Sequence, residues 1–168
     1  MPRSPKSPTV PFRVGYGYDV HRLESGPGMT LGGVKIRSSV RLVGHSDADV
    51  LLHAICDSLL GAAALGDIGK HFPNTVRRYR GISSLKLLTA SRRAIERAGY
   101  RVVNVDSTVI LERPKIGAAT RRMEARIART LGIAATAVSV KATTNEGLGS
   151  LGRGEGCAAI SVALLMQG

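Results

Sequence analysis

The spacing of hydrophobic and polar residues predicts alternating strands and helices along most of the chain. Residues 13–21 read as a strand with small residues interleaved. In residues 47–65 apolar positions recur at helical spacing, and residues 83–98 predict a second helix between a serine and Gly99. The same signals predict a hairpin over 29–36 around Gly32-Gly33, a strand over 100–111, a helix over 115–131 after Pro114, and strands over 138–143 and 157–166.

This order of elements predicts an α/β (α+β) fold, in which a single layer of helices covers one face of a four-stranded mixed sheet, with the small hairpin beside it. The other face of the sheet would also need cover, which indicates packing against other copies of the chain. Residues 1–11 are rich in proline and serine and predict a disordered tail, with the end of a transit or linker segment as the alternative. Residues 12–168 are expected to form one domain.

Composition narrows the classes of function. The hydrophobic fraction of 43% is enough for a core, and the absence of any apolar run near 20 residues argues against a membrane span. Cys56 and Cys157 are too few for a disulfide framework and fit a reducing compartment. The formal charge of +12 suits an anionic substrate or a nucleic acid, but aromatic residues make up only 4% of the chain, which weakens base stacking.

Histidines beside carboxylates are the strongest chemical signal. Asp19 and His21 are two positions apart on a predicted strand, so their side chains project from the same face. A second group recurs every four residues: His45, Asp49, His53 and Asp57. Asp19 and His21 together with one histidine of the helix would supply three metal ligands and leave one coordination position open, as in a catalytic zinc site. The remaining carboxylates could orient the imidazoles.

The alternative is a hydrogen-bonded pair on the strand and an ordinary polar face on the helix. Lysine and arginine are absent from residues 42–69 of this basic chain, which favours a bound cation.

A glycine-rich segment suggests phosphate handling. Residues 147–156 hold five glycines, which let backbone amides approach a ligand closely. Thr143 and Thr144 offer hydroxyls, and Glu146 could hold Mg²⁺ or Mn²⁺ between phosphate oxygens. A plain surface turn is the alternative. Because neither a Walker motif nor a dinucleotide-binding glycine fingerprint is present, P-loop and Rossmann functions are disfavoured.

Three segments carry a resemblance to a known family: GYDVHRL at 17–23, GHSDADVLLHAICDSLLGAAALGDIGKHFP at 44–73 and KATTNEGLGSLGRGEG at 141–156. In this order they resemble the 2-C-methyl-D-erythritol 2,4-cyclodiphosphate synthases of non-mevalonate isoprenoid biosynthesis. The resemblance implies a metal-dependent phosphorus-oxygen lyase. In its reaction, the 2-phosphate of 4-diphosphocytidyl-2-C-methyl-D-erythritol 2-phosphate attacks the β-phosphorus of the same molecule, and CMP leaves. A basic nucleic-acid-binding module, suggested by the arginine pairs at 77–78, 92–93 and 121–122, is the alternative.

The resemblance also implies roles for individual residues. Zinc would be held by Asp19, His21 and His53, and a second cation, Mg²⁺ or Mn²⁺, by Glu146. His45 and Ser46 would contact the phosphate end, and His45 with Thr144 would support the transition state. The other implied substrate contacts are Asp67 and Gly69 at the ribose, Phe72 and Asn74 in the following turn, and Pro114, Lys115, Thr143 and Thr144 around the cytidine.

The implied assembly is a homotrimer with active sites between subunits, in the bacterial cytoplasm or the plastid stroma. Arg153 would line a central cavity able to hold an isoprenoid diphosphate, and no nucleic acid or membrane is expected as a partner. Asn74, Val76 and Ser150 depart from the family pattern, so contacts at the methylerythritol end and in the cavity are expected to differ.

Overall fold

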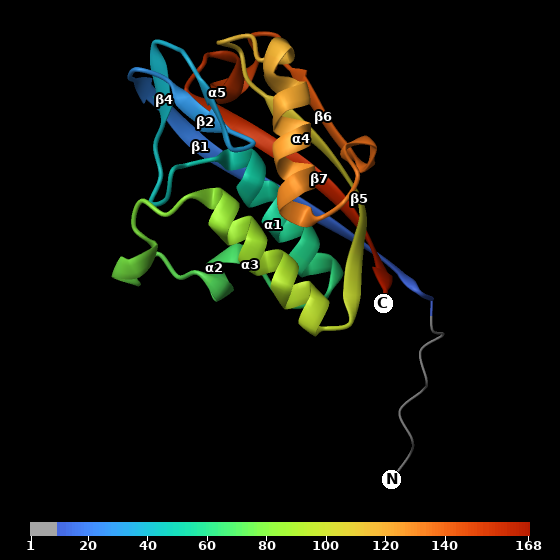
Figure 1. Ribbon diagram of the computed structural model, residues 1–168. Helices are drawn as coiled ribbons and strands as arrows, with labels where there is room; N and C mark the ends of the chain where they lie inside the picture. Colours follow the sequence, from blue (N-terminus) through green and yellow to red (C-terminus); the bar gives the residue numbers. More distant parts are fainter. Residues whose placement is uncertain (1–9) are drawn as a thin grey trace.

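The computed structural model describes residues 10–168 apart from the side chain of Arg78, so all but the last two residues of the predicted tail lie outside the described part. Along the chain (Figure 1) the strands and α-helices are β1 Phe12–Ser25, β2 Met29–Leu31, β3 Val34–Ile36, β4 Val40–Leu42, α1 Val50–Ala62, α2 Ile68–His71, α3 Ser84–Arg97, β5 Tyr100–Ile110, α4 Thr120–Leu131, β6 Val138–Thr143, α5 Gly149–Gly152 and β7 Gly156–Gln167. Short 3₁₀ turns are η1 Arg77–Tyr79, η2 Gly117–Ala119 and η3 Ala135–Ala137.

The strands form a mixed sheet, as predicted, with the order β4-β1-β7-β5-β6. Only β5 and β6 run parallel, and the other neighbours in this sheet are antiparallel. The fifth strand, β4, was not predicted, because three residues are too short to show periodicity. Strands β2 and β3 form the expected hairpin, in which Gly32 and Gly33 adopt the positive φ angles of a tight turn.

Helices α1, α3 and α4 cover one face of the sheet (Figure 1), and α1 packs closest to it. The glycines of β1 permit this approach. A Cβ atom at Gly15 would lie 1.9 Å from the carbonyl oxygen of Ser58, and one at Gly17 would lie 2.0 Å from that of Ala54. The backbone of α1 therefore rests directly on β1, which brings the middle of the helix beside the residues that follow Gly17.

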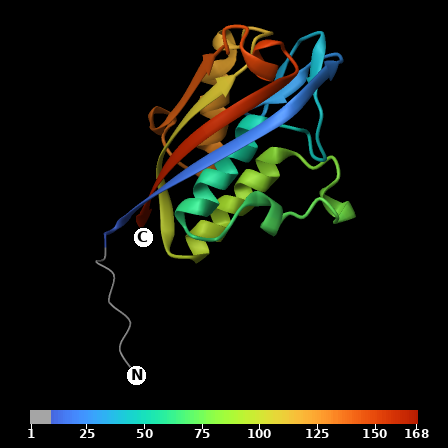
Figure 2. The same cartoon turned by 180° about the vertical axis from the view of Figure 1, so that it is seen from behind.

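No helix within residues 10–168 covers the other face of β1 and β7, as Figure 2 shows. The side chains of β1 that alternate with these glycines are apolar or aromatic and 48–69% exposed: Phe12, Val14, Tyr16, Tyr18 and Val20. An apolar strip of this length is unusual on a monomer. The expectation of an uncovered sheet face is therefore met within the described chain.

Two helices are shorter than predicted at their starts. The helix expected over 47–65 begins only at Val50, because the side chain of Asp49 accepts a hydrogen bond from Leu52 N–H and caps it. The helix expected over 115–131 begins at Thr120, after the 3₁₀ turn η2. Within residues 10–168, none of the helices combines the length and the apolar character that a membrane crossing requires.

Candidate functional site

Asp19 and His21 of β1 meet His53 of α1, and their potential ligand atoms all lie within 4.8 Å of one another. Asp19 Oδ2 is 2.9 Å from His21 Nε2 and 3.0 Å from His53 Nδ1. The two imidazole nitrogens are 3.2 Å apart. We call these three residues the metal-binding triad. The pairing of strand positions 19 and 21 with one helical histidine is as predicted.

The hydrogen bond of His21 determines which of its nitrogens is free. His21 Nδ1 lies 2.7 Å from the carbonyl oxygen of Val43. A carbonyl oxygen can only accept, so Nδ1 carries the proton of the neutral imidazole, and Nε2 then presents its lone pair to the triad.

The orientation of His53 follows from a longer chain of hydrogen bonds. Ser84 Oγ donates to Asp47 Oδ1 at 2.5 Å, so toward its other neighbour, His53 Nε2 at 3.0 Å, it acts as an acceptor. Ser46 Oγ lies at the same distance from Nε2. In the neutral imidazole, His53 Nε2 therefore carries the proton, and the lone pair of Nδ1 is available to a cation held by the triad.

Charges within the triad support its use as a cation site. Burial raises the pKa of Asp19. When the imidazoles of His21 and His53 are protonated, however, the N–H groups that face Asp19 donate to it, and these hydrogen bonds and positive charges outweigh burial and hold its pKa far below the ordinary value. Burial lowers the pKa of His21, but its hydrogen bonds to Asp19 and to the Val43 carbonyl raise the pKa by more. The net shift of the His21 pKa is therefore upward. The ionised carboxylate thus attracts positive charge to this point even without a metal.

Two imidazole nitrogens and one carboxylate oxygen, with their lone pairs converging, form a donor set that fits a divalent metal ion. Glu146, predicted to bind a second cation, is not part of this group. It lies in an exposed turn with a φ of 51°, where it accepts a hydrogen bond from Thr144 Oγ1.

The four-residue repeat predicted as one stripe is divided by the structure. His45 precedes the helix and lines a cavity with His53. Asp49 is fully buried and accepts hydrogen bonds from the N–H groups of Gly32 and Gly33, and Asp57 accepts one from Ile68 N–H. These two carboxylates therefore hold the backbone. The prediction that they orient the imidazoles was wrong.

Asp47 and Ser84 orient the imidazole of His53 instead, and sequence reasoning missed both. They are 37 positions apart, and nothing in the local pattern of either residue connects it to a histidine.

A cavity of about 360 Å³ opens beside the triad. His21 and His53 line it together with several predicted substrate contacts: His45, Ser46, Gly69, Phe72 and Asn74. Asp67 is the N-cap of α2 and accepts a hydrogen bond from Lys70 N–H, so it fixes the turn that carries Gly69. One set of predicted residues therefore does converge on the metal-binding triad.

The remaining predicted residues lie elsewhere on the chain. Pro114, Lys115, Thr143 and Thr144 line a separate cavity of about 400 Å³, which shares no lining residue with the first. Arg153 is exposed and pairs with Glu155 at 2.6 Å. A single chain thus presents two separate parts of the expected site.

Comparisons with known proteins identify the family of the chain. The model of the YgbB family matches residues 12–166. A relative from Syntrophomonas wolfei named 2-C-methyl-D-erythritol 2,4-cyclodiphosphate synthase is 57% identical over 156 residues, which cover 93% of this chain and 99% of the relative.

Two solved structures share the fold. The CDP complex of IspF from Plasmodium falciparum superposes with a TM-score of 0.82 at 35% identity, covering 93% of this chain and 96% of that one. The bifunctional IspDF from Campylobacter jejuni gives a TM-score of 0.90 at 37% identity. That match covers 94% of this chain but only 42% of the bifunctional one.

Proposed function

The chain belongs to the YgbB family, whose relatives are cyclodiphosphate synthases of non-mevalonate isoprenoid biosynthesis, and we propose how its own residues perform that cyclisation. The enzyme is a cyclising lyase. It converts 4-diphosphocytidyl-2-C-methyl-D-erythritol 2-phosphate to 2-C-methyl-D-erythritol 2,4-cyclodiphosphate and releases CMP. Attacking and attacked phosphates are both anionic, so the site must offset charge and hold the substrate in a folded conformation.

The observation that carries the proposal is the convergence of Asp19, His21 and His53 at the edge of a cavity. These three residues would hold one zinc ion, which, when bound, supplies Lewis-acid polarisation of a phosphate oxygen. Val43 and Ser84 hold the two imidazoles with their lone pairs facing inward, so the ligands need no rearrangement to bind.

Other residues of the same cavity bind and orient the substrate. His45 and Ser46 contact its phosphate end, because both line the cavity next to His53. Asp67 and Gly69 hold the ribose at the start of α2. Phe72 and Asn74 close the cavity wall at the methylerythritol end, where Asn74 supplies an amide for hydrogen bonding.

The cytidine pocket comes from an adjacent copy in a homotrimer. Pro114, Lys115 and Thr143 form this second part, and Thr144 and Glu146 follow on the same loop. The exposed apolar strip on β1 is the surface that we propose packs against the other copies.

Within this assembly Thr144 supports the transition state together with His45. Glu146 would hold a second cation, Mg²⁺ or Mn²⁺, which when bound offsets the negative charge of the diphosphate. Arg153 faces a central cavity that can take an isoprenoid diphosphate. The bacterial relatives favour the cytoplasm as the location.

The role of the triad is tested by His53→Ala, with His71→Ala as the matched control. His71 binds the carbonyl oxygen of Leu65 at 3.0 Å and does not belong to the triad. We expect CMP release to fall at least about a hundredfold in His53→Ala, because metal polarisation contributes several kcal/mol, and zinc content to fall with it. Unchanged turnover by a His53→Ala protein shown to contain no metal would refute the proposal.

Sharing of the site between copies is tested by mixing two inactive variants. His53→Ala lacks one half of the proposed site and Glu146→Ala lacks the other. A mixed trimer places two intact halves together at one interface, so activity should return on subunit exchange. Mixed trimers detected by native mass spectrometry but without activity would show that the halves act within one chain.

A further inference from the structure

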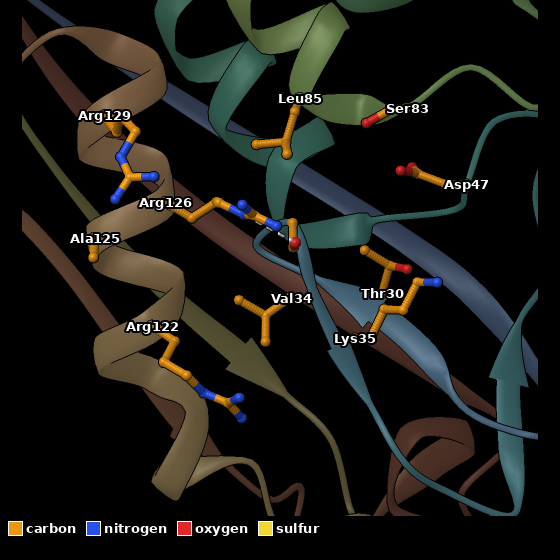
Figure 3. Close-up of a pocket in the computed structure, with 11 residues that line it drawn as sticks. Thr30, Val34, Lys35, Asp47, Ser83, Leu85, Arg122, Ala125, Arg126 and Arg129 are labelled. Carbon is orange, nitrogen blue, oxygen red and sulfur yellow. Dashed lines mark hydrogen bonds between the residues drawn. The ribbon is translucent and has the colours of Figure 1, made fainter.

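A groove of about 760 Å³ lies between α4, the β2–β3 hairpin and the start of α3. In Figure 3, Arg126 extends from α4 toward the hairpin, and the side chain of Lys35 points toward Asp47. It shares no lining residue with the cavity beside the triad or with the proposed cytidine pocket. Apart from Asp47, whose carboxylate positions Ser84 behind His53, the residues that line it have no role in the reaction described above.

Four basic side chains line the groove: Lys35 of β3 and Arg122, Arg126 and Arg129 of α4. The arginines are spaced by four and three residues, so they share one face of the helix over a rise of about 10 Å. Within residues 10–168, none of the four forms an ion pair. Arg126 Nε donates to the carbonyl oxygen of Gly33 at 3.4 Å, which holds this side chain across the groove (Figure 3).

The groove has one acidic lining residue, Asp47, and its carboxylate is already engaged. One oxygen accepts from Ser84 Oγ at 2.5 Å and the other from Ser84 N–H at 3.0 Å. The four basic groups therefore exceed the negative charge of this one carboxylate, and the groove keeps an excess of positive charge.

The basic and apolar side chains of the groove favour a ligand with several phosphate groups. One guanidinium group can donate two hydrogen bonds to the oxygens of a phosphate. A row of three arginines therefore suits a chain of phosphates better than a single phosphate. Val34, Leu85 and Ala125 add apolar surface between the charges. None of the described residues that line the groove is aromatic, so they lack the stacking surfaces that single-stranded nucleic acids use. The volume is that of a small-molecule site.

We propose that this groove binds a polyphosphate ligand at a site separate from the cyclisation reaction. The phosphates lie along Arg122, Arg126 and Arg129, and Lys35 binds them from the hairpin side. The ligand is either a nucleoside polyphosphate, which also uses the apolar surface, or an inorganic phosphate chain.

The test is calorimetric titration of the wild-type chain with ATP and with inorganic tripolyphosphate at about 150 mM salt, where non-specific attraction is screened. Excess CMP is present throughout to fill the cytidine pocket. The variant is Arg122→Ala/Arg129→Ala, which leaves the Arg126 contact to the hairpin intact. The control is Arg97→Ala/Arg121→Ala, which removes the same charge from exposed positions outside the groove.

We expect the groove variant to bind the polyphosphate at least tenfold more weakly than wild type, and the control to stay within about twofold. Tighter binding of ATP than of tripolyphosphate would identify the nucleotide as the ligand type, and equal binding the inorganic chain. Unchanged CMP release in both variants would show that they fold. No binding at millimolar concentration, equal weakening in the two variants, or a preference for duplex DNA over both probes would overturn the proposal.

Discussion

Removal of the Ser84 hydroxyl should weaken metal binding although Ser84 is not a metal ligand. Ser84 is fully buried and joins Asp47 to His53 Nε2 through hydrogen bonds of 2.5 and 3.0 Å. In Ser84→Ala, Nε2 keeps only Ser46 Oγ as a partner, at 3.0 Å. The preference for a proton on Nε2 becomes weaker, and with it the preference for a lone pair on Nδ1.

The size of the effect follows from the remaining hydrogen bond. Loss of a hydrogen-bond partner behind a metal-bound histidine typically lowers affinity about 10- to 100-fold, or about 1.4–2.7 kcal/mol. Because Ser46 still supports His53, we expect Ser84→Ala to lie near the tenfold end. The double variant Ser46→Ala/Ser84→Ala leaves no hydroxyl at Nε2 and should approach a hundredfold.

The assay is competition for zinc against a chromophoric chelator, with Co²⁺ absorption as a second measure of ligand geometry. Ser83→Ala is the matched control, because Ser83 stands at the same helix start and its side chain makes no capping hydrogen bond. Circular dichroism establishes that each variant is folded. Zinc affinity in Ser84→Ala equal to that of Ser83→Ala would refute the reasoning, as would ¹⁵N NMR of the wild type showing the His53 proton on Nδ1.

Three further predictions concern packing, acid–base behaviour and the second cation. Gly17→Ala should cost about 1–3 kcal/mol or more in urea unfolding, because the new Cβ would lie 2.0 Å from a carbonyl oxygen of α1, whereas Gly117→Ala, with open space around it, should be close to neutral. Burial raises the pKa of Asp49 to about 6, above its unfolded value of about 4, so the folded chain holds this proton more tightly. Its stabilising contribution is therefore full below about pH 4 and lost as pH rises to about 6, and Asp49→Ala should cost less at pH 7 than at pH 5; a larger cost at pH 7 would contradict the sign. Glu146→Gln should abolish the stimulation of CMP release by Mg²⁺ while zinc content stays at the wild-type level, and a parallel loss of zinc would show that the two sites are not separate.

The order of strands and helices and the metal-binding triad could be predicted because their signals are local. Asp19 and His21 share a strand face through a period of two, which holds wherever the strand packs. The helix that carries His53 shows its own periodicity. Both signals lie within a few residues of the side chains that they place.

Predictions that required exact helix limits were less accurate. The stripe from His45 to Asp57 assumed one continuous helix, but the cap at Asp49 divides it. The same residue is drawn away from the histidines by the N–H groups of Gly32 and Gly33, a contact across 16 or 17 positions. Local patterns cannot report which distant backbone group a carboxylate will meet.

The sequence by itself determined which faces of β1 and α1 carry chemistry, because side-chain direction follows from backbone periodicity alone. Tertiary structure decided which nitrogen of each imidazole is free, since that depends on Val43 and on Ser84, residues 22 and 31 positions away. It also decided that arginines of α4 and Lys35 of the hairpin line the same groove. Hydrogen bonds and electrostatic fields act between atoms that are near in space, and only the folded chain sets those distances.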